Sequence, residues 1–353
     1  MFNLPGDLVE EILCRVPATS LSQLRYTCKQ WNNLCNNRTF TRKHLDKAPK
    51  QYFLLLMSKH DKVCLMSVNF CGVPSIEIKG EYGLTNPQAN FEIYAVSHCE
   101  GLLLCNDRKY SRIVVWNPCT GQTNWIQPRN RGSFALGSYQ DKNYGGNSYK
   151  ILSCPGSNKK EFEIYEINTK VWKTLDVTLD CELEHVDHSK SLKGKTCWFA
   201  SDENEEQRGM FLVSFDYTTE VFERLLPPCQ CLYHKAFSLS VVREEKLSVL
   251  LIHGDASRTE IWLTNKIDDT KVVSWSKFLT VDLKAQHCIW GVPKFLVDEE
   301  NKFIVVCQFL LGSDLMKQVA YIAGEDNKVK QVCSGPVSSF LSLSYYVPSL
   351  GCY

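Results

Sequence analysis

The spacing of apolar residues divides the chain into two regions. In the first 48 residues, apolar side chains recur every three or four positions, as on one face of an α-helix. Leu8, Ile12 and Leu13 share one such face, and Leu24 and Trp31 belong to a second. We expect three short helices here, with more apolar surface than so small a core can bury.

Proline and serine residues mark the ends of these helices. Pro5 suits the first turn of a helix, where its missing N–H is harmless, and Pro17 stops that helix. Ser20 is expected to cap the second helix, and the apolar residues around His44 predict a short third one.

From residue 49 onward the pattern is that of strands and turns. Short runs rich in Val, Ile, Leu and aromatic residues alternate with clusters of Gly, Asn, Asp and Ser. Three segments share one order, in which a strand and an Asn or Asp turn precede an aromatic residue that opens a second strand. They are residues 112–125, 162–172 and 211–222.

The aromatic residues of these repeats are evenly spaced. Trp125, Trp172, Phe222 and Trp275 follow one another at intervals of about 50 residues. One further step in each direction falls near Ile76 and near Val329, where similar strand patterns occur without the aromatic residue. A four-stranded period of about 50 residues is typical of kelch-type propeller blades. We therefore expect a large all-β, propeller-like region with about six blades. The alternative is a β-sandwich, or two small β domains, with coincidental spacing.

Charge and composition exclude several classes of protein. The 353 residues include 40 Lys and Arg and 39 Asp and Glu, so bulk charge does not favour a nucleic-acid partner. No apolar run approaches the ~18 residues of a membrane-spanning helix. The N-terminus lacks the pattern of a secretory signal, so we expect a chain of the cytoplasm, the nucleus or both. The 17 cysteines are then expected to be reduced and mostly buried.

Candidate chemistry is sparse. His185 and His188, near Glu182 and Glu184, could approach a metal, but such a pair is more typical of a solvated surface loop. No Cys-x-x-Cys pair completes a zinc site, and the usual hydrolase and nucleotide-binding motifs are absent. We expect no metal, no cofactor, no catalytic residue and no enzymatic activity. The alternative is a propeller enzyme with a Tyr and His cluster in its central channel.

Two regions carry a family resemblance. The N-terminal segment resembles an F-box, through the strings Leu4-Pro5, Asp7-Leu8, Glu11-Ile12-Leu13, Pro17 and Cys28-Lys29-Gln30-Trp31-Asn32. The remainder resembles the type 1, kelch-like F-box-associated domain of a large plant family of F-box proteins, through residues 97–105, 115–122, 162–165, 289–291 and 303–307. We therefore expect an F-box domain over residues 1–48 and an F-box-associated β domain over residues 49–353.

The resemblance implies the substrate-recognition subunit of a Skp–cullin–F-box (SCF) ubiquitin ligase. Its partners would be a Skp-type adaptor, through it a cullin and a RING subunit, and an unidentified target protein. The alternative is an F-box protein that acts outside the ligase as a protein-binding scaffold. The positions that match adaptor-binding residues are Leu4, Pro5, Leu8, Ile12, Leu13, Leu21, Leu24, Cys28 and Trp31.

These residues could instead pack inside the helical unit. For Leu24 and Trp31 this interpretation is as well supported as adaptor binding, whereas Leu4, Pro5 and Leu8 are the better candidates for adaptor binding. No motif identifies the target-binding residues. Residues 127–147, rich in Gly and Asn, and the acidic residues 201–208 are expected to be loops that could recognise a partner.

Overall fold

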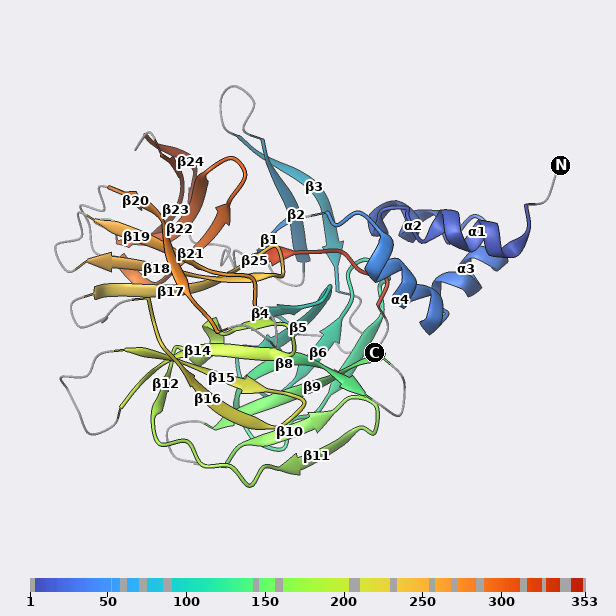
Figure 1. The fold of residues 1–353 in the computed structure, drawn as a ribbon, viewed down its shortest axis with the longest axis horizontal. Coiled ribbons are helices and arrows are strands. Elements are labelled where there is room, and N and C mark those ends of the chain that lie inside the picture. Colours follow the sequence, from blue (N-terminus) through green and yellow to red (C-terminus); the bar gives the residue numbers. More distant parts are fainter. Residues whose placement is uncertain are drawn as a thin grey trace.

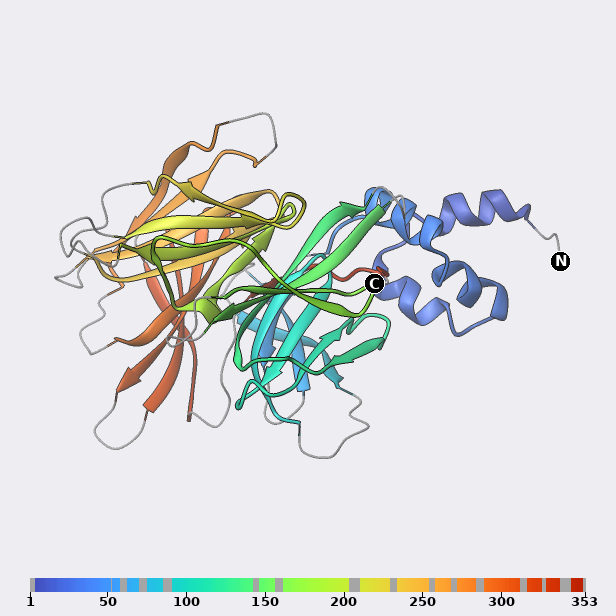
Figure 2. The same cartoon turned by 90° about the horizontal axis from the view of Figure 1, so that it is seen from below.

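A group of N-terminal helices projects from one side of a ring of β-sheets (Figure 1; Figure 2). The chain is described by a computed structural model. The described residues are 4–51, 53–57, 62–69, 75–84, 91–141, 146–155, 161–202, 210–228, 234–253, 258–267, 272–283, 289–311, 316–325, 328–336 and 344–351.

The helical region contains four helices where the sequence predicted three. They are α1 (Gly6–Leu13), α2 (Ala18–Leu24), α3 (Lys29–Cys35) and α4 (Arg38–Lys47). Pro5 directly precedes α1. Pro17, which was expected to stop the first helix, instead directly precedes α2, since α1 already ends at Leu13, and Ser20 lies inside α2 and does not cap it. The predicted second helix is split because Thr27 donates its hydroxyl to the carbonyl of Leu24, and Cys28 then caps α3 by accepting from the N–H of Trp31.

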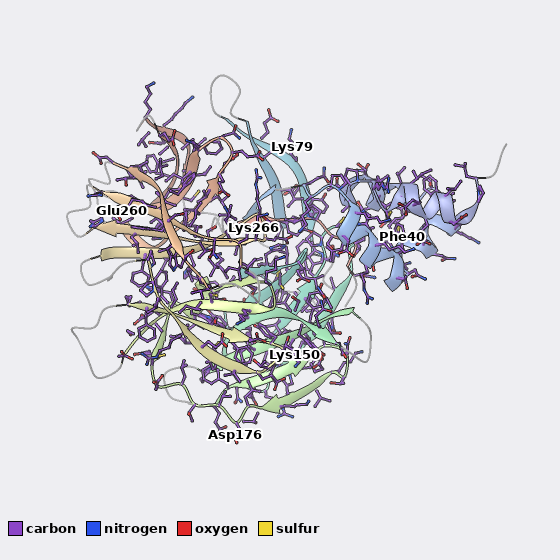
Figure 3. The ribbon with its side chains drawn as sticks, viewed as in Figure 1. Phe40, Lys79, Lys150, Asp176, Glu260 and Lys266 are labelled. Carbon is purple, nitrogen blue, oxygen red and sulfur yellow. The ribbon has the colours of Figure 1, made fainter. Side chains whose placement is uncertain are left out.

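Three side chains hold the four helices together. Phe40 is buried at the centre of the helical core (Figure 3). Arg25 is buried and donates to the side-chain oxygens of Asn32 (3.0 Å) and Asn36 (2.7 Å), which ties α2 to α3. His44 Nε2 lies 2.7 Å from the carbonyl of Val16, so α4 is fixed to the chain just after α1.

The described strands form six sheets that close into a ring. The innermost strands contact one another in the order β25, β4, β8, β13, β17, β21 and again β25. Further strands extend outward from each inner strand by antiparallel pairing. This arrangement is a six-bladed β-propeller, and it confirms the fold class predicted from the sequence.

The blades follow the order of the chain except at the closure. Blade 1 contains β25 (Ser344–Tyr346), β1 (Phe53–Met57), β2 (Lys62–Asn69) and β3 (Ser75–Gly83), and blade 2 contains β4 (Ile93–Cys99), β5 (Leu102–Asp107), β6 (Ile113–Trp116) and β7 (Thr123–Ile126). Blade 3 contains β8 (Gly132–Asp141), β9 (Gly146–Pro155), β10 (Glu163–Glu166) and β11 (Val171–Thr174). Blade 4 contains β12 (Glu182–Glu184), β13 (Lys190–Leu192), β14 (Lys195–Ser201), β15 (Phe211–Asp216) and β16 (Val221–Leu225). Blade 5 contains β17 (His234–Val242), β18 (Lys246–His253), β19 (Thr259–Thr264) and β20 (Trp275–Val281), and blade 6 contains β21 (Ile289–Asp298), β22 (Phe303–Leu311), β23 (Met316–Gly324) and β24 (Val329–Pro336).

The ring is closed by its last strand. β25 pairs with β1 in antiparallel fashion, with Tyr346 opposite Phe53 and Ser344 opposite Leu55. One blade is therefore built from both ends of the propeller sequence. Such a pairing prevents the first and last blades from separating, because the two ends of the ring share one sheet.

Apolar side chains fill the spaces between neighbouring blades. One buried cluster joins blades 2 and 3, and others join blades 1 and 2, 3 and 4, 4 and 5, and 5 and 6. Hydrogen bonds and ion pairs between blades supplement these clusters. The buried Lys150 of β9 reaches Glu220 (2.6 Å) and the carbonyl of Tyr217 (3.2 Å) in blade 4 (Figure 3).

The predicted period corresponds to the outermost strand of every blade. The four aromatic residues that defined it, Trp125, Trp172, Phe222 and Trp275, lie in β7, β11, β16 and β20. The two extrapolated positions, Ile76 and Val329, lie in β3 and β24. The sequence thus located all six blades, although two of them lack the aromatic residue.

The prediction of a long loop over residues 127–147 was wrong. β8, the inner strand of blade 3, occupies residues 132–141 of that segment, β9 begins at Gly146, and residues 142–145 lie outside the described residues. Gly137 of β8 is a packing residue, because a Cβ there would lie 1.9 Å from a ring carbon of Tyr217. Of the predicted loop 201–208, all but Ser201 and Asp202 lies outside the described residues.

Candidate functional site

An exposed apolar stripe runs along the first helix and the residues before it. Leu4, Leu8 and Ile12 are 57%, 49% and 53% exposed, and they recur at every fourth position. This spacing aligns them along one side of α1. We call these three residues the α1 apolar face. An exposed apolar side chain that stands alone is common on protein surfaces. Several that lie side by side usually mark an interaction surface.

The predicted adaptor-binding residues divide into an outer and an inner group. Pro5 and Cys28 are exposed, like the α1 apolar face. Leu13 and Leu21 are buried in the helical core, and Leu24 and Trp31 are partly buried against it.

The structure also places one large exposed side chain that the sequence reasoning did not select. Tyr26 is 78% exposed and lies between α2 and α3, with the guanidinium of Arg25 5.8 Å from the centre of its ring. The sequence could have indicated this exposure, because Tyr26 lies in the turn just before Cys28.

Ion pairs hold the other side of α1 against α4. Lys43 pairs with Glu10, and Lys47 lies 2.9 Å from Glu11. The hydrogen bond from Lys47 is the main reason why the pKa of Glu11 is lowered. Because these pairs are solvent-exposed, they add little stability, but they orient α1 so that its apolar face points away from α4.

The helical core includes a residue from the far end of the sequence. Leu350 is 1% exposed and belongs to the same buried cluster as Leu13, Leu21 and Phe40. Cys119, in the turn between β6 and β7, packs against this cluster, and its sulfur lies 3.4 Å from the carbonyl of Ala18. The helical region and the propeller therefore share one core.

The chain that carries Leu350 is held in place by blade 2. Asn117 is fully buried, and its amide nitrogen donates to the carbonyls of Ser349 and Gly351, both at 2.9 Å. Gly101 has a φ of +83°, and a Cβ there would lie 2.3 Å from the Cβ of Ser349. From the sequence, Asn117 is only the turn residue of the segment 112–125. Nothing in the sequence near Asn117 predicted its contact with residues 349–351.

Polar contacts complete this interface. Thr19 donates to the side-chain oxygen of Gln51 (2.6 Å), and Lys50 pairs with Glu244 of blade 5 at 2.9 Å. With the shared core, these contacts reach blade 5 as well as blade 2, so the helical region is attached at more than one point.

A cavity of about 670 Å³ lies between the helical region and the ring. Leu45, Asp46 and Lys50 form part of its wall from the helical side, and His98 and Lys190 form part of it from the inner strands of blades 2 and 4. This volume falls in the range of small-molecule sites.

His185 is exposed, as expected of a surface loop, whereas His188 is only partly exposed, so that interpretation was wrong for His188. A short 3-10 helix, η1 (Val186–His188), runs between β12 and β13 and contacts the inner strands β4 and β8. Burial, with smaller effects of nearby cations, lowers the pKa of His188 to about 2. Over the residues that the structure describes, no group of three or more His, Cys, Asp or Glu side chains could hold a metal ion. Within the same residues, no helix has the length and apolar character needed to span a membrane.

We expect the free energy of unfolding to fall as the pH decreases from 7 to 5. Burial lowers the pKa of His44, and burial with the charge of Lys190 lowers that of His98 to about 3. These side chains and His188 stay neutral in the folded chain but become protonated in the unfolded chain below about pH 6.5. Denaturant unfolding at pH 7, 6 and 5 measures the effect, and equal stability at all three would contradict it.

Comparisons with known proteins agree with this architecture. A family model described as the F-box domain matches residues 1–43, and one described as the F-box associated beta propeller domain matches residues 53–351. A probable F-box protein of Arabidopsis thaliana is 56% identical over 359 residues, which cover 99% of this chain and 86% of that protein. A putative F-box protein of the same plant is 51% identical, with 99% of this chain and 97% of that protein covered.

A third relative carries the kelch designation. An F-box/kelch-repeat protein of Arabidopsis thaliana is 40% identical over 371 residues, which cover 99% of this chain and 92% of that protein. The family models and these relatives span both the helices and the propeller. The chain therefore belongs to the family of F-box proteins that carry an F-box-associated β-propeller domain.

Proposed function

We propose that the chain is the substrate-recognition subunit of a Skp–cullin–F-box ubiquitin ligase. In this role the F-box binds a Skp-type adaptor, which connects the chain to a cullin and a RING subunit, and the propeller holds a target protein. The transfer chemistry belongs to other subunits, so the chain itself acts as a non-enzymatic adaptor in the cytoplasm or the nucleus. The observation that carries the proposal is the α1 apolar face, which stays exposed although the helical core beneath it is complete.

The α1 apolar face suits docking of a helix into a groove. Leu4, Leu8 and Ile12 supply apolar anchors along one line, and Pro5 fixes the chain at the start of that line. A few such anchors usually carry most of the binding free energy of an interface. Leu24 and Trp31 support the surface from behind, and the buried Leu13 and Leu21 hold the core on which it rests.

The attachment of the F-box to the propeller suits the presentation of a target. Leu350 and Cys119 pack into the helical core, so the two parts are held in a defined orientation. The F-box occupies one side of the ring, and the far side carries no part of it (Figure 2). A target held on a rigid ring raises the effective concentration of its lysines near the ubiquitin-loaded subunit.

A binding measurement with purified Skp-type adaptor tests the proposal. Replacing Leu8 by alanine is expected to weaken binding by about 30-fold, since truncation of one apolar anchor costs about 2 kcal/mol. Leu226→Ala serves as a matched control, because Leu226 lies on the propeller and is 87% exposed. This control is expected to bind the adaptor as the wild type does.

The result separates three outcomes. A wild-type chain that folds but binds no adaptor overturns the proposal. Equal weakening by Leu8→Ala and Leu226→Ala overturns the role of the α1 apolar face. Adaptor binding without recruitment of cullin to the complex contradicts the ligase role and indicates a scaffold that acts outside the ligase.

A further inference from the structure

The inner wall of the propeller carries a lysine, Lys190, that forms no ion pair with any of the residues that the structure describes. Lys190 opens β13, and this strand contacts the inner strands of blades 2, 3 and 5. The side chain lines the cavity of about 670 Å³. Among the described residues, nothing forms a hydrogen bond or an ion pair with its ammonium group. Such a group is expensive to bury unless an anion or water accompanies it.

The side chains of Lys294 and His98 lie near this lysine, and neither carries a negative charge. Burial and the nearby charge of Lys294, on β21, lower the pKa of Lys190 to about 7. His98, on β4, accepts a hydrogen bond at Nε2 from the N–H of Gly101 (2.9 Å), so its ring proton is on Nδ1. Lys190 of blade 4 and His98 of blade 2 line the same cavity, so its wall carries nitrogen donors from two blades.

The acidic residues of the cavity wall are already engaged. Glu100 accepts from Ser138 (2.7 Å) and Asn147 (2.9 Å), and Glu244 pairs with Lys50. Asp216 caps the turn after β15 by accepting from the N–H of Thr218 and lies 3.6 Å from Lys195. Asp46 belongs to the exposed end of α4.

Outside the cavity wall, the nearby Asp187 is engaged as well. It accepts from the hydroxyl of Tyr110 at 2.5 Å. None of these carboxylates forms an ion pair with Lys190.

We propose that this cavity binds a small-molecule oxyanion, with a phosphate or carboxylate group held by Lys190. A small molecule fits better than a segment of a protein, because Leu45 and Asp46 of the F-box, and Lys50 just after it, form part of the wall. The occupant would touch both the F-box and the propeller and so stabilise their interface. This site is independent of the adaptor-binding role of the α1 apolar face.

Thermal unfolding of the full chain tests the site with two probes, inorganic phosphate and citrate, at constant ionic strength. The midpoint of the wild type is expected to rise in a saturable manner with at least one probe, because a ligand that binds only the folded state stabilises it. Saturation by phosphate alone assigns a phosphate ligand, and saturation by citrate alone assigns a carboxylate.

Two substitutions with the same change of charge locate the effect. Lys190→Met is expected to weaken binding of the probe by at least 10-fold, while Lys173→Met, at an exposed position of β11, leaves it unchanged. Without a probe, Lys190→Met is expected to be at least as stable as the wild type, since it removes a partly buried charge that pairs with none of the described residues.

An equal rise of the midpoint in all three chains reflects general exclusion of the salt from the protein surface and overturns the proposal. Calorimetric titration of the wild type with phosphate and with citrate gives a measurement that needs no variant. One saturable site per chain supports the proposal, and the absence of saturable heat with both probes overturns it.

Discussion

Replacing Leu350 by alanine is expected to lower the free energy of unfolding by about 3 kcal/mol, the middle of the range for a fully buried leucine. The side chain is 1% exposed, and it packs with Leu21 and Phe40 in the core of the F-box. The truncated side chain leaves a cavity at the point where the two domains meet. Denaturant unfolding followed by circular dichroism measures the loss.

The matched control is again Leu226→Ala. Because that leucine is 87% exposed, the same chemical change is expected to alter stability by no more than about 0.5 kcal/mol. Leu350→Ala is also expected to make the F-box more sensitive to limited proteolysis than the propeller, because the shared core is weakened. A loss of stability no larger than that of the control would show that residues 347–350 do not anchor the F-box.

Replacing Gly137 by alanine is expected to cost about 3 kcal/mol, at the upper end for overpacking of a well-filled core. The added methyl group would lie 1.9 Å from a ring carbon of Tyr217. That ring has little freedom to move, since it is fully buried and its hydroxyl lies 3.0 Å from Thr196 Oγ1 and 3.2 Å from the carbonyl of Ala135. Either β8 or the contact between blades 3 and 4 must give way.

Two comparisons isolate this clash. Gly83→Ala, at the end of β3, is expected to be close to neutral, because no atom lies within 4 Å of the position of its Cβ. In a chain that already carries Tyr217→Ala, the cost of Gly137→Ala should largely disappear, and a double-mutant cycle measures this coupling. A cost that is unchanged in that background would place the strain elsewhere.

Local periodicity accounts for most of what the sequence revealed about the fold. The recurring strand, turn and aromatic residue located the outer strands of the blades, because β-hairpins are encoded by nearby residues. β8 was missed because its glycines resemble those of a loop, whereas Gly137 is required by a contact with blade 4. The three-residue β25 gave no periodic signal, and its partner β1 lies at the opposite end of the propeller sequence.

The candidate docking surface was predictable only in part, for a related reason. Spacing identifies which residues share a helix face, but not which faces another element covers. Leu13 and Leu21 match the F-box pattern as well as Leu8 does, yet both are buried. Leu350 and Asn117 meet through the fold alone, and nothing near either residue indicates the other. Lys190, which pairs with none of the described residues, was missed for the same reason, since the lack of a partner is a property of three-dimensional packing.

The shared dependence on β25 and Leu350 sets an order of events during synthesis. The F-box leaves the ribosome first, but neither the ring nor the helical core is complete until residues 344–350 have followed. A polypeptide interrupted before Ser344 would lack the closing strand of blade 1 and leave a hole in the F-box. Unfinished chains would then be poorly folded at both ends, which disfavours their entry into a ligase complex. The position of one leucine thus makes completion of the whole propeller a condition for a well-formed F-box.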